Sequence, residues 1–232
     1  MLVKYWMNKD VVTVDVDDSM QAAISQMRKH AKNLLPVLKK GNLVGVITDR
    51  DLKRASASDA TALEIHELAY LISKIKCGDI MTKNVVTVPP DFTLEEASAQ
   101  LLMRNISGMP VVDEKGKIVG TISQQEIFLA LISLTGFGKK GMQLALEVED
   151  RPGSIKEITD IIRDYGGRLV SLLTSYETAH PGHRRLYVRT WAVDRKRVSE
   201  MIADLKQKAR LLYIVDHSEG KREEFVGSSW AA

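Results

Sequence analysis

The stretch MNKDVVTV at residues 7–14 returns as MTKNVVTV at residues 81–88, 74 residues later. After one extra residue in a turn, GVITDRD at 45–51 is echoed by GTISQQE at 120–126. Solenoid repeats have a period of roughly 20–50 residues, and this period is longer. The sequence therefore predicts two copies of one small module, packed as a pair with equivalent clefts between them.

Composition narrows the class of protein. The chain has 232 residues and a net charge of +3, and residues 1–138 carry 16 basic and 16 acidic side chains. This balance does not suggest nucleic acid as a partner, because such proteins carry a clustered basic face. Cys77 is the single cysteine, so no disulfide framework or cysteine metal site is expected. No secretory signal or membrane-spanning run is visible, which favours a cytoplasmic protein without a membrane partner.

Both copies have the same order of predicted elements. The β-branched runs at 11–14 and 85–88 predict strands, and Ser19 and Thr93 are typical helix N-caps. A hairpin follows in each copy, and a second helix begins after the Thr or Ser of the GVIT and GTIS segments. Each module is therefore predicted as β-α-β-β-α.

These motifs resemble the CBS domain pair, also called the Bateman module. The resemblance covers residues 1 to about 135 and rests on the doubled G-h-h-[ST]-x-x-[DNE] element, where h is hydrophobic, and the doubled h-P-V-h strand. It implies that adenine nucleotides (AMP, ADP or ATP) or a compound like S-adenosylmethionine bind in the clefts between modules, and that no cofactor is required.

The chemistry of the first GVITDRD element suits such a ligand. Gly45 lets backbone approach closely, Thr48 lies where strand becomes helix, and the Asp51 carboxylate can accept two hydrogen bonds from a ribose diol. Backbone N–H groups at the helix start suit a phosphate. By position in the family, the resemblance implies a first cleft made of Val46, Ile47, Thr48, Asp51, Val86, Ser107, Gly108, Met109 and Pro110.

A second cleft is implied by the other copy. Its residues are Val12, Asn33, Leu34, Pro36, Thr121, Ile122, Ser123 and Glu126. Glu126 replaces the usual aspartate, and Asn33 and Leu34 offer little to a phosphate, so we expect the first cleft to be the better nucleoside site. An alternative interpretation is that the hydroxyls and carboxylates only cap helices, and that the cations Arg50, Lys53, Arg54 and Arg104 are solvated surface charges.

A third unit follows a glycine- and lysine-rich boundary at 136–141. The order of predicted strands and helices over 142–216 is β-α-β-β-α-β, a ferredoxin-like arrangement. The turn DRPGS at 150–154 and the later Gly166-Gly167 resemble the ACT domain, a regulatory module that binds amino acids. The resemblance implies a ligand loop of Glu149, Asp150, Arg151, Pro152, Gly153 and Ser154. The alternative is a plain turn with Ser154 as a cap, in a unit that only dimerises.

The predicted class is thus α+β, with two β-α-β-β-α CBS modules forming a pseudo-two-fold pair and a ferredoxin-like ACT domain after them. The domains are CBS module 1 (1–60), a connecting helix (61–77), CBS module 2 (78–135), a linker (136–141), the ACT domain (142–216) and a polar C-terminal tail (217–232) that is flexible or docks its aromatics on a partner. This order resembles the bacterial acetoin utilisation proteins.

The expected function is regulatory and non-catalytic. Ligand in the CBS clefts, with a small amino acid or carboxylate at the ACT unit, is expected to change the conformation or assembly of a homodimer that signals to an effector protein. The rival hypothesis is a scaffold or dimerisation protein with vestigial clefts. No catalytic constellation is visible, and no metal site is predicted: His180, His183 and Glu177 flank a Pro-Gly turn, where solvent-exposed side chains are more usual than ligands.

Overall fold

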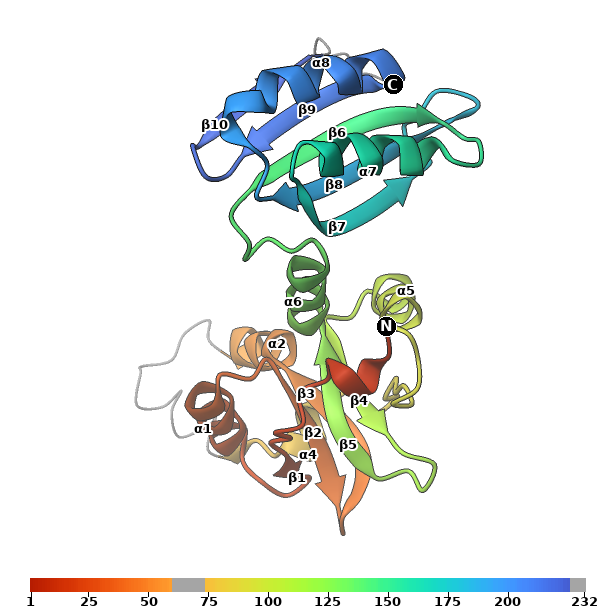
Figure 1. Cartoon of the computed structure of the whole chain (residues 1–232). Coiled ribbons are helices and arrows are strands. Elements are labelled where there is room, and N and C mark those ends of the chain that lie inside the picture. The colour runs from red at the N-terminus through yellow and green to blue at the C-terminus, as the bar shows by residue number, and fades with distance from the viewer. Residues whose placement is uncertain (60–73, 226–232) are drawn as a thin grey trace. The chain divides into compact units, whose positions relative to one another are not determined.

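The computed structural model describes residues 1–59 and 74–225, and the chain divides into two compact units, residues 1–129 and 130–232 (Figure 1). Each unit is described by itself. Most of the predicted connecting helix at 61–77 lies outside the described residues. Within the described residues, no helix is long and apolar enough to cross a membrane.

The first unit contains both copies of the repeat. The first copy has η1 (Val3–Tyr5), β1 (Val14–Asp15), α1 (Met20–His30), β2 (Leu34–Lys39), β3 (Asn42–Thr48) and α2 (Asp49–Asp59). The second has α4 (Cys77–Ile80), α5 (Leu94–Arg104), β4 (Gly108–Val112), β5 (Ile118–Ser123) and α6 (Gln124–Leu134). The mixed α+β class is confirmed. The strands predicted at 11–14 and 85–88 were too long: only β1 and a single bridge from Val88 to Val111 form.

The helix starts follow the sequence signals. The Ser19 hydroxyl accepts a hydrogen bond from Ala22 N at 3.2 Å, and the Thr93 hydroxyl accepts one from Glu96 N at 3.1 Å. The Glu96 carboxylate accepts in return from Thr93 N at 2.7 Å, which completes a capping box. Gly41, with φ of +80°, closes the β2–β3 hairpin at the predicted position.

The two copies exchange their leading segments. Asn8, in the leading segment of the first module, forms a two-way backbone bridge with Thr121 of β5 in the second module (2.9 Å each way). Thr82, in the leading segment of the second module, forms the same bridge with Val46 of β3 in the first (2.9 and 3.0 Å). Each module therefore completes its sheet edge with a residue supplied by the other.

This exchange explains the glycine of each repeat. A Cβ on Gly45 would lie 2.3 Å from Met81 Sδ, and a Cβ on Gly120 would lie 2.6 Å from Met7 Sδ and 3.0 Å from the Asn8 carbonyl oxygen. Such distances are well inside van der Waals contact. The prediction that Gly45 makes room for a ligand is therefore wrong, because the space is taken by a methionine of the exchanged segment.

The second unit has the predicted β-α-β-β-α-β order. Its elements are β6 (Met142–Glu149), α7 (Ser154–Asp164), β7 (Arg168–Ser175), β8 (His183–Trp191), the short η2 (Arg195–Arg197), α8 (Val198–Lys208), β9 (Arg210–Asp216) and β10 (Lys221–Glu224). The antiparallel sheet has the order β10-β9-β6-β8-β7, and both α7 and α8 cover one of its faces (Figure 1). Leu144, Leu146, Ile162 and Leu205 lie fully buried in the core between sheet and helices.

The sequence predicted a polar tail from residue 217, but the structure has a further strand there. Residues 221–224 form β10, which pairs with β9 and extends the sheet. Phe225 N donates to Leu212 O at 2.9 Å, and the Phe225 ring packs against the core of its own unit rather than being left for a partner chain. Charged strands such as β10 are rarely read from sequence, because their pairing depends on the neighbouring edge. Trp230 lies outside the described residues.

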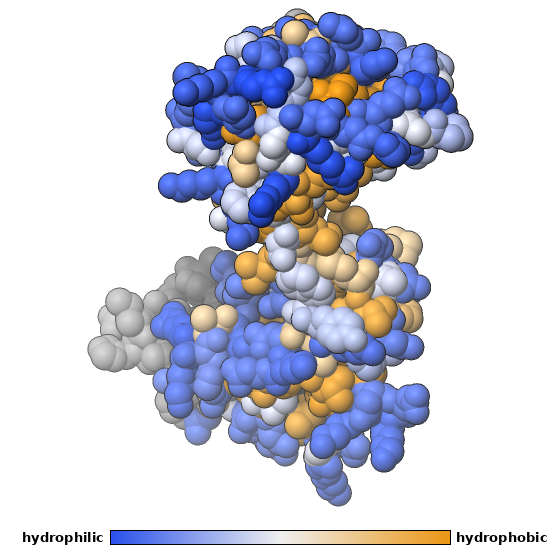
Figure 2. Space-filling view, viewed as in Figure 1, coloured by the Kyte–Doolittle hydropathy of each residue, from blue (hydrophilic) through white to orange (hydrophobic). Residues whose placement is uncertain are grey.

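The surface is mostly hydrophilic, with apolar patches (Figure 2). Helix α6 is an apolar element at the surface. This helix exposes about half of each of five large apolar side chains: Phe128, Leu129, Leu131, Ile132 and Leu134. Contiguous apolar surface of this kind marks an interaction face more often than a random feature.

Candidate functional site

Asp51 lies in the first turn of α2, directly after β3, and the residue as a whole is only 6 % exposed. Its Oδ2 accepts hydrogen bonds from Thr48 N (2.9 Å) and Thr48 Oγ1 (2.7 Å). Asp51 N points back to Thr48 Oγ1 at 3.4 Å. The Thr-x-x-Asp spacing thus forms a reciprocal cap, which satisfies N–H groups that a helix start otherwise leaves unpaired. The capping interpretation from sequence is correct for this oxygen.

The other carboxylate oxygen has different neighbours. Asp51 Oδ1 pairs with Arg54 Nη2 at 3.0 Å and lies 3.5 Å from Thr82 Oγ1. Thr82 comes from the segment exchanged between modules, so the carboxylate joins both copies of the repeat. The guanidinium side chain of Arg54 is 72 % exposed, whereas the Asp51 side chain is 8 % exposed. One oxygen therefore belongs to the helix cap, and the other faces the exposed Arg54 guanidinium and the Thr82 hydroxyl.

Asp51 lines a pocket of about 640 Å³ between the two modules, which we call the Asp51 pocket. Seven of the residues assigned to the first cleft line it: Val46, Thr48, Asp51, Val86, Ser107, Gly108 and Pro110. Ile47 and Met109 do not, because their side chains point into the cores and are at most 1 % exposed. Their place in alternating strands explains this, since neighbouring side chains point to opposite faces.

Further residues of this pocket were not assigned to it from sequence: Asn33, Asp49, Arg50, Arg54, Thr82, Asn84, Arg104, Asn105 and Ile106. Asn33 had been placed in the second cleft. Arg50, Arg54 and Arg104 had been interpreted as solvated surface charges. Thr82 aligns with Asn8 in the repeat, but this alignment does not show that its side chain reaches Asp51 of the other module.

Three guanidinium groups and two carboxylates give the pocket its charge. Asp49 forms a salt bridge of 2.6 Å with Lys53, which does not line the pocket. Asp51 is paired with Arg54, while Arg50 donates only a long hydrogen bond of 3.5 Å to the Asn105 carbonyl oxygen. Arg50 and Arg104 thus leave positive charge near the wall formed by Ser107 and Gly108. Such a pocket suits a ligand with a hydroxyl-rich part and an anionic part.

The second cleft repeats the cap with different neighbours. Glu126 Oε2 accepts from Ser123 N at 2.9 Å and from the Ser123 hydroxyl. Thr121 is engaged in the backbone bridge to Asn8. Leu34, Pro36 and Ile122 are buried, and Val12 is half-buried. The residue one turn after Glu126 is Leu129, where the first module has Arg54.

The predicted ligand loop of the second unit is an ion-paired turn. Arg151 lies between Glu149 (2.9 Å) and Glu157, with which it forms two hydrogen bonds (2.8 and 2.9 Å). Gly153, with φ of +90°, is the N-cap of α7, so the interpretation of Ser154 as the cap is wrong. The Ser154 hydroxyl instead donates to Arg151 O at 3.0 Å. Asp150 and Pro152 are exposed.

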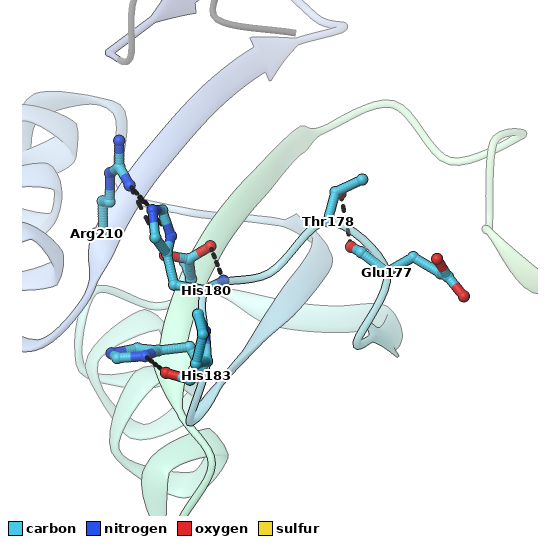
Figure 3. Close-up of polar contacts among 7 residues, drawn as sticks. Glu177, Thr178, His180, His183 and Arg210 are labelled. Atoms are coloured by element: carbon cyan, nitrogen blue, oxygen red, sulfur yellow. Dashed lines mark hydrogen bonds and ion pairs between the residues drawn. The ribbon is translucent and has the colours of Figure 1, made fainter. Parts of the chain in front are cut away.

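The histidines of the 176–183 loop do not converge with Glu177 (Figure 3). His180 Nδ1 lies 2.6 Å from Oε1 of the buried Glu147, and Arg210 Nη1 approaches the same imidazole at 3.4 Å. His183 Nδ1 bonds Pro181 O at 3.0 Å, and the Glu177 carboxylate points away from both rings (Figure 3). Among the described residues, no group of three or more potential metal ligands comes together. His180 therefore fastens this loop to the sheet.

The first unit is similar to known proteins. A model of the CBS domain family matches residues 3–58 and 77–133. A CBS domain-containing protein of Dictyostelium discoideum is 30% identical over 135 residues, which are 58% of this chain and 93% of that protein. An inosine-5′-monophosphate dehydrogenase of Korarchaeum cryptofilum is 35% identical over 120 residues, but these make up only 22% of the enzyme.

A solved structure resembles the same part of the chain. The CBS domain pair of protein MJ0100, in complex with 5′-methylthioadenosine and S-adenosyl-L-methionine, is 30% identical, with a TM-score of 0.50. The match covers 60% of this chain and 98% of that domain pair. The similarity therefore spans a complete pair of CBS modules in that protein.

Proposed function

The chain belongs to the CBS domain family, and we propose that it is a regulatory protein whose Asp51 pocket binds an adenosyl compound. One observation carries the proposal: a nearly buried carboxylate, supplied by one module, faces a pocket of about 640 Å³ whose opposite wall belongs to the other module. Ribose hydroxyls are donors that a carboxylate accepts, and the cations Arg50 and Arg104 suit a phosphate.

The relatives support this choice of ligand. The similar domain pair of MJ0100 was solved with two adenosyl compounds, 5′-methylthioadenosine and S-adenosyl-L-methionine. The pocket of this chain spans both modules, so a bound ligand would favour one arrangement of the pair over others. A ligand shifts such an equilibrium only through its different affinities for the two arrangements. This is the physical basis that we propose for signalling.

Thermal unfolding of the full chain with AMP, ADP, ATP, S-adenosylmethionine and 5′-methylthioadenosine tests the proposal. A ligand at 100 times its Kd adds about 2.7 kcal/mol of apparent stability. We expect Asp51→Asn to abolish this shift, because the amide still accepts from Thr48 but cannot accept two hydroxyls on its other side. The matched variant Glu126→Gln should keep the shift. No shift with any compound, or an unchanged shift in Asp51→Asn, favours a scaffold with vestigial clefts.

We also propose that the second unit is an ACT domain, in the order found in acetoin utilisation proteins. The β-α-β-β-α-β order and the Asp-Arg-Pro-Gly-Ser turn at the start of α7 support this. A small amino acid or carboxylate would meet the first N–H groups of α7 beside Arg151. Isothermal titration with the twenty amino acids tests it. Binding that is lost in Arg151→Ala supports a sensor, and no binding supports a unit that only dimerises.

A homodimer is the assembly that we propose for the signalling form, with an effector protein as recipient. The apolar face of α6 supports this, because exposed Phe128, Leu131 and Ile132 favour burial against a second copy. Light scattering of the purified chain should give twice the chain mass. Leu131→Asp should return it to the monomer mass, while Lys139→Asp, an exposed change outside that helix, should not.

A further inference from the structure

Arg54 occupies the position that a ribose must take on Asp51. A carboxylate offers about four lone-pair positions. Two on Oδ2 are filled by the Thr48 N–H and hydroxyl, at 2.9 and 2.7 Å. Oδ1 accepts from Arg54 at 3.0 Å and lies near Thr82 Oγ1 at 3.5 Å. The carboxylate on which the proposed function depends therefore has no free strong acceptor position.

The partners of Asp51 differ in how readily they can leave. The Thr48 contacts belong to the start of α2, so breaking them would leave a helix N–H without its cap. Among the described residues, Arg54 forms a salt bridge with Asp51 alone, and its side chain is 72 % exposed. Water can solvate its guanidinium once it is released, so exchange costs little. An incoming diol is thus expected to displace Arg54.

Arg54 also has room to leave. Besides the Asp51 pocket, it lines an adjoining pocket of about 350 Å³ with Asp51, Ala55, Ile75, Asp79, Ile80 and Met81. The Arg54–Asp51 pair lies where both pockets meet. The second module has no equivalent of this pair, because Leu129 stands where Arg54 would be.

We infer that Arg54 is a specificity-determining residue that competes with the ribose diol for Asp51 and so selects adenosine ligands that carry an anionic group. This rests on the proposed function of the Asp51 pocket. A neutral ligand must break the Arg54–Asp51 pair and offers the released guanidinium nothing in return. A phosphorylated ligand breaks the same pair but adds an anion to a pocket lined by three guanidinium groups.

Calorimetric titration of the full chain with neutral 5′-methylthioadenosine and with AMP tests the inference. We expect Arg54→Ala to bind 5′-methylthioadenosine about fivefold more tightly than the unmodified chain, and AMP no more tightly. The affinity of Arg54→Lys for 5′-methylthioadenosine should lie between those of the unmodified chain and Arg54→Ala. The matched control is Lys53→Ala, which removes a similarly exposed positive charge on the same helix but from a lysine paired with Asp49. It should leave affinity for the neutral ligand unchanged.

A second probe isolates the diol. With the 2′-deoxy analogue of 5′-methylthioadenosine, which lacks one of the two hydroxyls, Arg54→Ala should give a smaller gain in affinity than it gives with 5′-methylthioadenosine itself. The inference is overturned if Arg54→Ala binds 5′-methylthioadenosine no more tightly while binding still depends on Asp51; the proposed function then survives. If neither the unmodified chain nor Arg54→Ala binds any of these compounds, both the inference and the proposed function are wrong.

Discussion

The two CBS modules share a framework and differ at the positions that meet the pocket. In both, a methionine from the other module packs against a strand glycine, and a hydroxyl-x-x-carboxylate cap begins the second helix. Around the caps, however, Asp51 meets Arg54 and Thr82, whereas the residues at the equivalent places in the second module are Leu129 and Asn8. The two modules therefore share their packing and differ in the polar side chains around the caps.

The largest expected effect on stability comes from the two strand glycines, and it shows whether both modules depend equally on the exchanged segments. Gly120→Ala should destabilise the chain by about 2–3 kcal/mol, because its Cβ meets the Asn8 backbone as well as Met7. Gly45→Ala should cost about 1–2 kcal/mol, since only the Met81 side chain must move. Urea unfolding measures both. Gly138→Ala, whose Cβ would meet nothing within 4 Å, is the control. A larger cost for Gly45→Ala would contradict this ranking.

The next largest effect on stability is expected from the carboxylates that cap α2 and α6, and the two should differ. Asp51→Ala removes a carboxylate that accepts from Thr48 and pairs with Arg54, and should cost about 1–2 kcal/mol, as lost N-caps do. Glu126→Ala removes contacts to Ser123 alone among its recorded partners and should cost about 1 kcal/mol or less. Thermal unfolding without ligand checks the order. Equal costs would show that the Arg54 pair adds nothing to folding.

A smaller effect on stability is expected at Cys77, which lies in the leading segment of the second copy and aligns with Val3 in the repeat. Both side chains are fully buried. Burial raises the pKa of the Cys77 thiol to about 11, so the reactive thiolate is scarce at neutral pH. We expect Cys77→Val to change stability by less than about 1 kcal/mol, as volume-conserving core changes do. In the unmodified chain, a thiol reagent should label Cys77 only after denaturation, and rapid labelling of the folded protein would disprove its burial.

The smallest effect concerns pH at the first long helix of each module. Hydrogen bonds from the Thr93 N–H and hydroxyl hold the pKa of Glu96 below its usual 4.5. Its contribution to stability is therefore present above pH 4.5 and is lost as the pH falls through the folded-state pKa. The first module has Ala22 at this place and no such group. The stability difference between the unmodified chain and Glu96→Gln should shrink from pH 6 to pH 3. A constant difference over that range would mean that the capping box does not titrate.

Much of the fold could be predicted because its signals are local. Ser19 and Thr93 cap helices where their spacing indicated, Gly41 closes its hairpin, and the tandem CBS resemblance is confirmed by the family match. The strands at 11–14 and 85–88 were overestimated, because β-branched residues favour strands only where a neighbouring strand is available. The strand β10 was missed for the converse reason: a charged edge gains its partner only in the folded sheet.

The candidate site was predicted less completely than the fold. Asp51 and Thr48 were found because the motif itself carries them, and they line the pocket with Ser107 and Gly108. Ile47 was wrongly included because a motif does not say which face of a strand each residue takes. Thr82 was missed, since nothing near it in the sequence shows that it reaches Asp51.

Neighbouring residues were enough to show that there are two copies of one module, that helices begin after Ser19 and Thr93, and that a carboxylate follows the last strand of each copy, because repeats, caps and turns are local. The folded structure was needed to show that the copies exchange their leading segments, that Met81 rather than a ligand requires Gly45, and that Arg54 already holds the acceptor oxygen of Asp51. These depend on side chains meeting across modules or competing for one atom, and the balance of such contacts exists only once the chain has folded.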